Sequence, residues 1–312
     1  MRTLRMAGIL VAALAFLPPA ALADMQRDLG SFFLVAARSI SGKNLSVDGP
    51  CDMGVVCAQP SSNSSCGTAS FEDVTFADGS QLGADVVSFN KPGASVFDLF
   101  TNGPTPRNVT VRDGGGALSL PLFPGACGAG CAPDVAALES MCGFPTPFPS
   151  CDASRPVTVG GGDCPNGLDT VPGNGRCDLP PGTYGDMVVR DNAKLSLSAG
   201  TYVACTFLVG KNAVVTGHGV ALQIDGGGFR IGNLSKLGSE CGDFAVRVKG
   251  QGPVTLGKTV SLVASLCAPA GSMSLGNGNQ LKGQFVGDTI AMDRSNVGEC
   301  CSCPPCPSPA FP

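Results

Sequence analysis

The stretch from Gly182 to about Gly298 repeats itself, and this repetition constrains the fold more than any other feature of the chain. Six copies of one nine-residue phrase can be aligned: MVVRDNAKL, FLVGKNAVV, FRIGNLSKL, VTLGKTVSL, MSLGNGNQL and the degenerate IAMDRSNVG. The third residues are all apolar, and they lie 20, 22, 25, 19 and 17 positions apart: Val189, Val209, Ile231, Leu256, Leu275 and Met292. Repeats of about 20 residues, with short strands and glycine-containing turns, are typical of a β-solenoid.

Alternation within each phrase supports stacked strands. In Val-Thr-Leu or Met-Ser-Leu the outer side chains point to one side of the strand and the middle one to the other. A single rung cannot bury its apolar side, so the rungs must stack, and six rungs at about 4.8 Å each would form a rod about 29 Å long. Helical apolar spacing is absent and glycine is frequent, which disfavours helix. We therefore predict an all-β protein with a parallel β-helix fold.

Asparagines recur at nearly matching corners of these repeats, at Asn192, Asn212, Asn233 and Asn277. Asparagine tolerates positive φ, so these residues could serve simply as turn formers. Stacked on one another, they could also form a ladder of amide hydrogen bonds. The sequence leaves both interpretations open.

The first 23 residues have the pattern of a secretory signal peptide. Arg2 and Arg5 precede an apolar run from Met6 to Leu17, and an Ala-Leu-Ala site follows, with cleavage expected after Ala23. No later apolar run reaches the roughly 18 to 20 residues that a membrane span needs. We expect an exported protein that is periplasmic, cell-surface or extracellular.

The mature chain divides by composition. Residues 24–112 are interpreted as a short N-terminal solenoid segment, residues 113–178 as a Gly/Pro/Cys-rich connector, residues 179–298 as the main solenoid and residues 299–312 as a Cys/Pro-rich tail. Within the connector, Asp134 to Met141 is expected to form one short helix. In the first segment, strands are expected at Phe33–Val35, Leu45–Val47, Val74–Phe76, Val86–Phe89 and Ser95–Phe97.

All sixteen cysteines follow the cleavage site, which indicates an oxidising compartment and a disulfide framework. The disulfide candidates are Cys51, Cys57, Cys66, Cys127, Cys131, Cys142, Cys151, Cys164, Cys177, Cys205, Cys241, Cys267, Cys300, Cys301, Cys303 and Cys306. Each solenoid segment contains three of them, so full pairing requires at least one bridge that leaves each segment.

The tail contains a Cys-Pro-Pro-Cys motif, Cys303 to Cys306, for which three interpretations compete. A redox pair usually begins a helix in a βαβ unit, and nothing here predicts one. A zinc site needs a second pair of ligands, and the adjacent Cys300 and Cys301 have poor geometry for it. We favour structural or intermolecular disulfides over a metal site or a redox pair.

Charge and motif content exclude several functions. Removal of Arg2 and Arg5 leaves 18 basic and 24 acidic side chains, a net charge of −6, which argues against nucleic acid as a partner. The single histidine, His218, could form a dyad with Asp225, but no nucleophile accompanies them. The other carboxylates are isolated, unlike the pairs that glycosidases use. We therefore predict no catalytic, cofactor-binding or metal-binding residues and no enzymatic activity.

Several phrases resemble a group of uncharacterised exported bacterial proteins. They are ADVVSFNKPGASVFDLFTN, LPLFPG, LPPGTYGDMVV, LSLSAGTYVACTFLVGKNAVV and GKTVSLVASLCAPAGSMSLGNGNQLKGQFVGDTIAM. The resemblance covers residues 85–123 loosely and residues 179–292 well. The resemblance implies a right-handed β-helix on the cell envelope or outside the cell, in some cases attached to pilus-like or adhesin proteins. It implies no catalytic residues. The cysteine content and the CPPC tail depart from the group's pattern.

The predicted function is that of an exported structural or adhesive β-solenoid protein. Its partner would be a glycan or another cell-envelope protein, and self-association could occur through the solenoid ends or the tail cysteines. The expected binding surface is one strand face that bears Thr255, Ser261, Ser272 and Ser274. The alternatives are a carbohydrate-active β-helix enzyme, a lyase or a hydrolase, and a subunit of a self-assembling filament.

Overall fold

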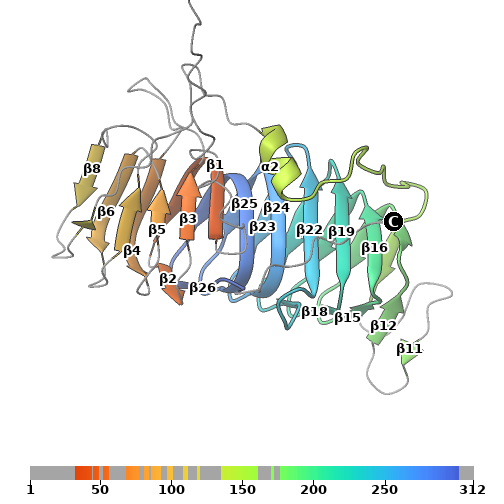
Figure 1. Cartoon of the computed structure of the whole chain (residues 1–312). Coiled ribbons are helices and arrows are strands. Elements are labelled where there is room, and N and C mark those ends of the chain that lie inside the picture. Colours follow the sequence, from red (N-terminus) through yellow and green to blue (C-terminus); the bar gives the residue numbers. More distant parts are fainter. Residues whose placement is uncertain are drawn as a thin grey trace, which may run out of the picture.

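The chain forms a rod of stacked β-strands (Figure 1). The computed structural model describes residues 32–43, 45–48, 52–55, 135–160, 170–171 and 176–301, and as backbone strands six further ranges between 68 and 119. The described strands form one 26-stranded sheet, in which β11 pairs antiparallel with β12 and all other pairs are parallel. The predicted all-β parallel solenoid is confirmed.

The strands lie on three faces of the rod, which follow from the strand pairings. Face 1 holds the repeated phrase, and its Val-Thr-Leu type strands pair in register, Val209 with Ile231 and Ile231 with Leu256. In order along the rod, face 1 consists of β10 (Val157–Val159), β14 (Asp186–Val189), β17 (Thr206–Val209), β20 (Phe229–Ile231), β23 (Val254–Leu256), the last residues of β24 (Ser261–Leu275) and of β25 (Gln280–Met292), the end of β1 (Phe32–Gly42), the start of β4 (Thr68–Phe76), the start of β6 (Val86–Pro92) and β8 (Asn108–Val111).

Faces 2 and 3 complete each turn. Face 2 consists of β12 (Arg176–Leu179), β15 (Lys194–Leu197), β18 (Val214–Gly217), β21 (Lys236–Leu237), the starts of β24 and β25, β26 (Asn296–Glu299), β2 (Leu45–Asp48) and the ends of β4 and β6. Face 3 consists of β13 (Gly182–Thr183), β16 (Gly200–Ala204), β19 (Val220–Asp225), β22 (Phe244–Lys249), the middles of β24 and β25, the start of β1, β3 (Asp52–Val55), β5 (Gln81–Gly83), β7 (Phe97–Phe100) and β9 (Leu118–Ser119).

The core runs along the axis of the rod between the three faces. The third residue of every repeated phrase is at most 4% exposed, as predicted. The first residues are buried too, and the rings of Phe207 and Phe229 stack at 5.9 Å. On face 3, the tyrosines of the two Gly-Thr-Tyr motifs, Tyr184 and Tyr202, stack their rings at 6.3 Å. Burial raises the pKa of Tyr202 to about 12, while its hydroxyl donates to the carbonyl of Leu179 at 2.6 Å.

The order of strands along the rod differs from their order in the chain. Residues 157–299 build the rod from β10 to β26, and residues 32–119 continue it from β1 to β9. The seam is a regular parallel pairing, with Leu34 opposite Phe285 and Ile40 opposite Ile290. Figure 1 shows this as orange and red N-terminal strands beside the blue C-terminal ones. The two solenoid segments therefore stack end to end in a single rod.

Helix α2 (Val135–Met141) confirms the predicted helix and lies against the outside of face 3 near this seam (Figure 1). Leu138 is buried among Val35, Ala37, Cys267 and Val286, which come from both segments. The helix thus holds the two segments together with apolar contacts.

The strand edge at the β10 end of the rod is partly covered. β11 (Thr170–Val171) pairs with β12 on face 2. Nearby, the N–H of Asp152 donates to the carbonyl of Tyr184 at 3.0 Å, and the N–H of Gly185 donates to the carbonyl of Arg155 at 2.9 Å. Covered edges of this kind hinder pairing with another chain.

The corner between faces 1 and 2 shows how the predicted asparagines act. Asn192 and Asn212 have positive φ, and the side-chain amide of Asn212 donates to Oδ1 of Asn192 at 2.8 Å. Asn233 and Asn277 lie one position earlier in their turns, where Oδ1 of Asn233 accepts from the N–H of Lys258 at 2.8 Å. The amide ladder is therefore a single step. A second polar ladder, not predicted, is buried inside this corner at Ser235, Asn279 and Asn296.

Candidate functional site

His218 pairs with a carboxylate other than Asp225, the one considered from the sequence. Its Nδ1 lies 3.0 Å from Oδ1 of Asp243, on the next rung of the rod. Asp243 is buried, and its other oxygen accepts hydrogen bonds from the N–H and hydroxyl of Ser239 and from the N–H of Glu240. Burial raises the pKa of Asp243, but the hydrogen bonds from His218, Glu240 and Ser239 outweigh it and hold that pKa below its usual 3.8.

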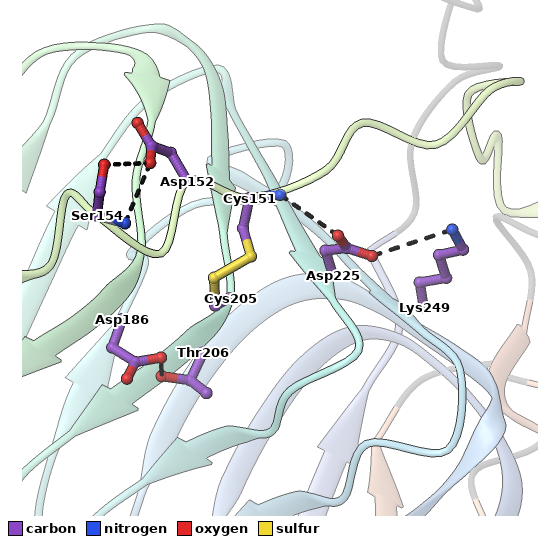
Figure 2. The surroundings of a disulfide bond; sticks show 8 residues. All are labelled: Cys151, Asp152, Ser154, Asp186, Cys205, Thr206, Asp225 and Lys249. Carbon is purple, nitrogen blue, oxygen red and sulfur yellow. Dashed lines mark hydrogen bonds and ion pairs between the residues drawn. A yellow bond between two sulfur atoms is a disulfide. The ribbon is translucent and has the colours of Figure 1, made fainter.

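Asp225 has a structural role on the outside of face 3. Its Oδ2 accepts from the N–H of Cys151 at 3.3 Å, and its Oδ1 lies 4.0 Å from Nζ of Lys249 (Figure 2). The same Lys249 lies over the ring of Phe148 at 5.5 Å. The His218–Asp225 dyad, for which the sequence offers no nucleophile, does not form, because Asp225 anchors the connector and His218 pairs with Asp243.

Other carboxylates singled out in the sequence also have separate partners. Figure 2 shows that Oδ1 of Asp186 accepts a hydrogen bond from the hydroxyl of Thr206 at 2.8 Å, while Asp152 accepts one from the hydroxyl of Ser154. Asp288 lies 3.0 Å from Nε of Arg38 across the seam, and burial raises its pKa although the Arg38 charge lowers it. Each of these side chains holds neighbouring rungs, loops or segments together.

Three disulfides join the main solenoid to the segments outside it, and disulfide bonding is thereby confirmed. They link Cys142 to Cys267, Cys151 to Cys205 and Cys241 to Cys301. The first attaches the connector to face 3, the second attaches it to the corner between faces 3 and 1 (Figure 2), and the third attaches the tail. Cys177 and Cys300 are disulfide-bonded as well. All three cysteines of the main solenoid therefore form bridges that leave it.

Some of the cysteine predictions lie outside the described residues. These are Cys51, Cys57, Cys66, Cys127, Cys131, Cys164, Cys303 and Cys306, and the signal peptide falls there too. In the described part of the chain no group of three or more His, Cys, Asp or Glu side chains is arranged to hold a metal ion. Among the same residues, no helix is long and apolar enough to cross a membrane.

Face 1 carries a regular array of seven small side chains near the seam, six of which bear a hydroxyl. The strands β23, β24, β25 and β1 are in register there: Thr255 lies opposite Ser274, Ser274 opposite Ala291, and Ala291 opposite Ser41. A second column two residues earlier in each strand holds Ser272, Thr289 and Ser39. We call these seven residues the hydroxyl surface. Ser272, Ser274, Ala291 and Ser41 are exposed.

Three of the four residues predicted for the binding face belong to this surface, and the fourth does not. Ser261 pairs with Lys236 and Gln280 on face 2. The reason is the length of β24, whose 15 residues bend across all three faces, so that alternation alone does not show the face to which a residue belongs.

Comparisons with known proteins add the following. Neither a protein-family model nor a curated protein matches the chain. The chain is similar to the solved structure of LeIBP, an ice-binding protein from an Arctic yeast. That structure was described as the basis for the antifreeze activity of LeIBP. The identity is 15%, with 89% of this chain and 97% of that chain covered and a TM-score of 0.37.

Proposed function

We propose that this protein is an exported, non-catalytic binding protein that uses the hydroxyl surface of face 1 to hold an uncharged, ordered glycan. The observation that supports the proposal is the two-column array at Thr255, Ser274 and Ala291 and at Ser272 and Thr289. Hydroxyls two residues apart in a strand are separated by roughly 6.6 Å, and neighbouring rungs by about 4.8 Å. The array therefore repeats in two directions, as the surface of an ordered polysaccharide does.

Rigidity supports this use of the surface. The strands of the array are paired on both sides, and the side chains beneath it, Leu256, Met273 and Ile290, are at most 2% exposed. A surface that is ordered before binding loses little conformational entropy when a ligand docks. Ser and Thr side chains are also short, so few rotamers are frozen.

The ligand should be uncharged because the array has no ionisable side chain among its seven residues. Hydroxyl groups can both donate and accept, which suits the hydroxyls of a neutral glycan. Binding through such contacts should depend little on salt. The strand pairing also continues this column beyond Ser41, since the next residues opposite one another in the backbone are Ser70, Ser88 and Thr110.

The test is a pull-down of the purified mature protein with insoluble cellulose and chitin. Ala291→Tyr places a bulky ring in the middle of the array, on an exposed position, and should abolish retention without changing the melting temperature. Val297→Tyr is the matched control, because Val297 is 38% exposed on face 2 and should tolerate the same ring. Equal retention of both variants, or no retention of the unmodified protein, would contradict the proposal.

Ice is the second candidate ligand, and the same two-dimensional periodicity favours it. An ordered lattice of water presents donors and acceptors at fixed intervals, which a rigid array of hydroxyls can match. The measurement is the growth rate and shape of ice crystals in the presence of the protein. Inhibition of growth that Ala291→Tyr removes and Val297→Tyr preserves would favour ice over a glycan.

The absence of catalysis has its own test. Polygalacturonate and neutral polysaccharides are incubated with the protein and assayed for new reducing ends and unsaturated products, and none is expected. The only His–Asp pair in the described residues is His218 with Asp243. Turnover by the unmodified protein that disappears in His218→Ala or Asp243→Asn would show that the protein is an enzyme and contradict the proposal.

A further inference from the structure

A groove of about 770 Å³ lies on face 1, on the β10 side of the hydroxyl surface. One wall consists of the outward middle residues of β14, β17 and β20, which are Val188, Leu208 and Arg230. The other wall is the corner between faces 1 and 2, where Lys211 and its neighbours lie.

The floor of the groove is bare backbone. Gly210, Gly232 and Gly257 occupy equivalent positions, one residue after each strand, and contribute no side chain. A Cβ on Gly232 would lie 2.6 Å from the carbonyl carbon of Gly210, so close stacking of the rungs requires glycine there. The same glycines that allow the rungs to stack therefore keep the groove open between its two walls.

The groove carries an excess of positive charge on an acidic protein. Arg190, Lys211 and Arg230 line it on three successive rungs, and all three are exposed. Its one carboxylate, Asp191, accepts the N–H of Lys211 at 2.6 Å, so this charge is partly satisfied by the backbone. The groove therefore holds three cations and one anion, a local charge of +2, whereas the chain as a whole has a net charge of −4.

We propose that this groove binds a strand of acidic polysaccharide that runs along the rod. Each of three rungs, about 4.8 Å apart, supplies one cation, so a polymer with a carboxylate on every sugar would meet a positive charge at each step. The fork of an arginine guanidinium fits a carboxylate with two parallel hydrogen bonds. Val188 and Leu208 are half-buried and give the apolar side of the sugar rings a surface to contact.

Other polyanions fit the groove less well. Single-stranded nucleic acid binds through bases that stack on aromatic side chains, and the residues lining this groove include none. The net negative charge of the chain also opposes the long phosphate backbone of a duplex. This proposal does not rest on the hydroxyl surface, because the groove residues other than Thr255 lie outside that surface.

The experiment measures binding of the purified mature protein to soluble polygalacturonate, with neutral dextran, dextran sulfate and a single-stranded oligonucleotide as the other probes. We expect polygalacturonate to bind at low salt and to weaken as the salt approaches about 0.15 M. Removal of one cation, in Arg230→Gln, should weaken binding about twofold to fivefold, and the triple variant with Arg190→Gln and Lys211→Gln should weaken it about tenfold or more.

Lys258→Gln is the matched control, since Lys258 occupies the same corner as Lys211 two rungs further along and does not line the groove. It should bind polygalacturonate like the unmodified protein, and all variants should keep the same melting temperature. Three outcomes would overturn the proposal: equal binding of the triple variant, equal binding of neutral dextran, or a preference for dextran sulfate or the oligonucleotide over polygalacturonate. Ala291→Tyr should leave polygalacturonate binding intact, which separates the failure of this site from that of the hydroxyl surface.

Discussion

Two regions of face 1 share one backbone and differ in chemistry. On the β14, β17 and β20 side, the outward middle residues are Val188, Leu208 and Arg230, and a basic groove runs beside them. On the other side the equivalent positions from Thr255 onward carry small hydroxyl or methyl groups, and the surface is uncharged. The inward residues beneath both regions are equally apolar and equally buried.

This difference shows that a solenoid separates stability from recognition. The inward positions must remain apolar, because each rung is stable only against its neighbours. The outward middle positions have no such constraint, so consecutive rungs can present different surfaces without a change in the fold. A single rod can therefore hold two ligands of different charge side by side on one face.

The largest expected effect comes from a substitution that unfolds the rod beneath both regions of face 1. Leu256, 2% exposed, lies under the border between them, and Leu256→Asp would bury an unpaired charge. We expect a loss of about 4 kcal/mol or more in the free energy of unfolding. Lys258→Ala, two positions along at the exposed corner, should change it by less than about 0.5 kcal/mol. Urea denaturation measures both, and similar midpoints would show that the register of the strands is wrong.

Removal of one disulfide should affect the two regions unequally. The Cys151–Cys205 bridge joins the connector to the residue before β17, the strand whose other end lines the groove, so Cys151→Ser with Cys205→Ser should cost about 2 to 5 kcal/mol. Polygalacturonate binding should weaken more than retention by cellulose or chitin. Under partial reduction, hydrogen exchange should rise in residues 142–155 before it rises in residues 182–298. Earlier exchange in the rod would contradict this order.

Acid should act in opposite directions on two carboxylates of the rod, Asp243 and Asp288. The pKa of Asp243, at the corner between faces 2 and 3, is lowered by folding, so its contribution to stability is present above 3.8 and is lost as the pH falls through the folded pKa. The pKa of Asp288, at the seam, is raised, so the folded form takes up this proton first and gains stability as the pH falls toward 3.8.

Two amide variants separate these contributions in urea midpoints measured from neutral pH to pH 3. Asp243→Asn should cost about 1 to 3 kcal/mol at neutral pH, because it weakens hydrogen bonds to a buried charge, and should flatten the loss in acid. At neutral pH, Asp288→Asn should leave the free energy of unfolding nearly unchanged or raise it, because the ionised carboxylate of Asp288 is disfavoured in the folded protein. Parallel pH profiles for the two variants would argue against this assignment.

The smallest expected effect comes from a substitution that extends the basic groove by one rung into the hydroxyl surface. Thr255→Arg adds a fourth cation to the end of the groove on a half-exposed residue. Polygalacturonate should bind about twofold to fivefold more tightly, with stability changed by less than about 0.5 kcal/mol. Unchanged affinity in a titration would mean that the polymer does not extend to this rung.

The local elements were predictable because the repeat encodes them. The inward third residues, the helix near Asp134 and the existence of disulfides followed from alternation, capping and cysteine content. The partner of His218 was also within reach of the sequence, since rungs here are up to 25 residues apart and Asp243 lies 25 residues after His218. Asp225 is nearer in sequence, only seven residues after His218, but it contacts the connector and Lys249. The groove, too, could have been found by comparing the middle residues of the six phrases.

The seam between the segments could not be predicted in the same way. Nothing local in β1 indicates that β25 is its neighbour, because the two pair through backbone groups and generic apolar contacts such as Ile40 with Ile290. The assignment of Ser261 failed for a related reason, since the bends of β24 depend on stacking against neighbouring rungs. Contacts between distant parts of the chain decide both features.

The seam also determines the order in which the rod can be completed. Synthesis begins at the N-terminus, so β1 and β2 exist long before β25 and β26, the strands on which they stack. Until residue 299 has been made, one edge of the N-terminal segment has no partner from its own chain. Such an edge invites pairing with other chains, and long-range pairing slows folding. Efficient production of this protein should therefore depend on preventing the N-terminal segment from pairing with other chains until the last rung has been synthesised. Slow release of the chain or a chaperone could provide this protection.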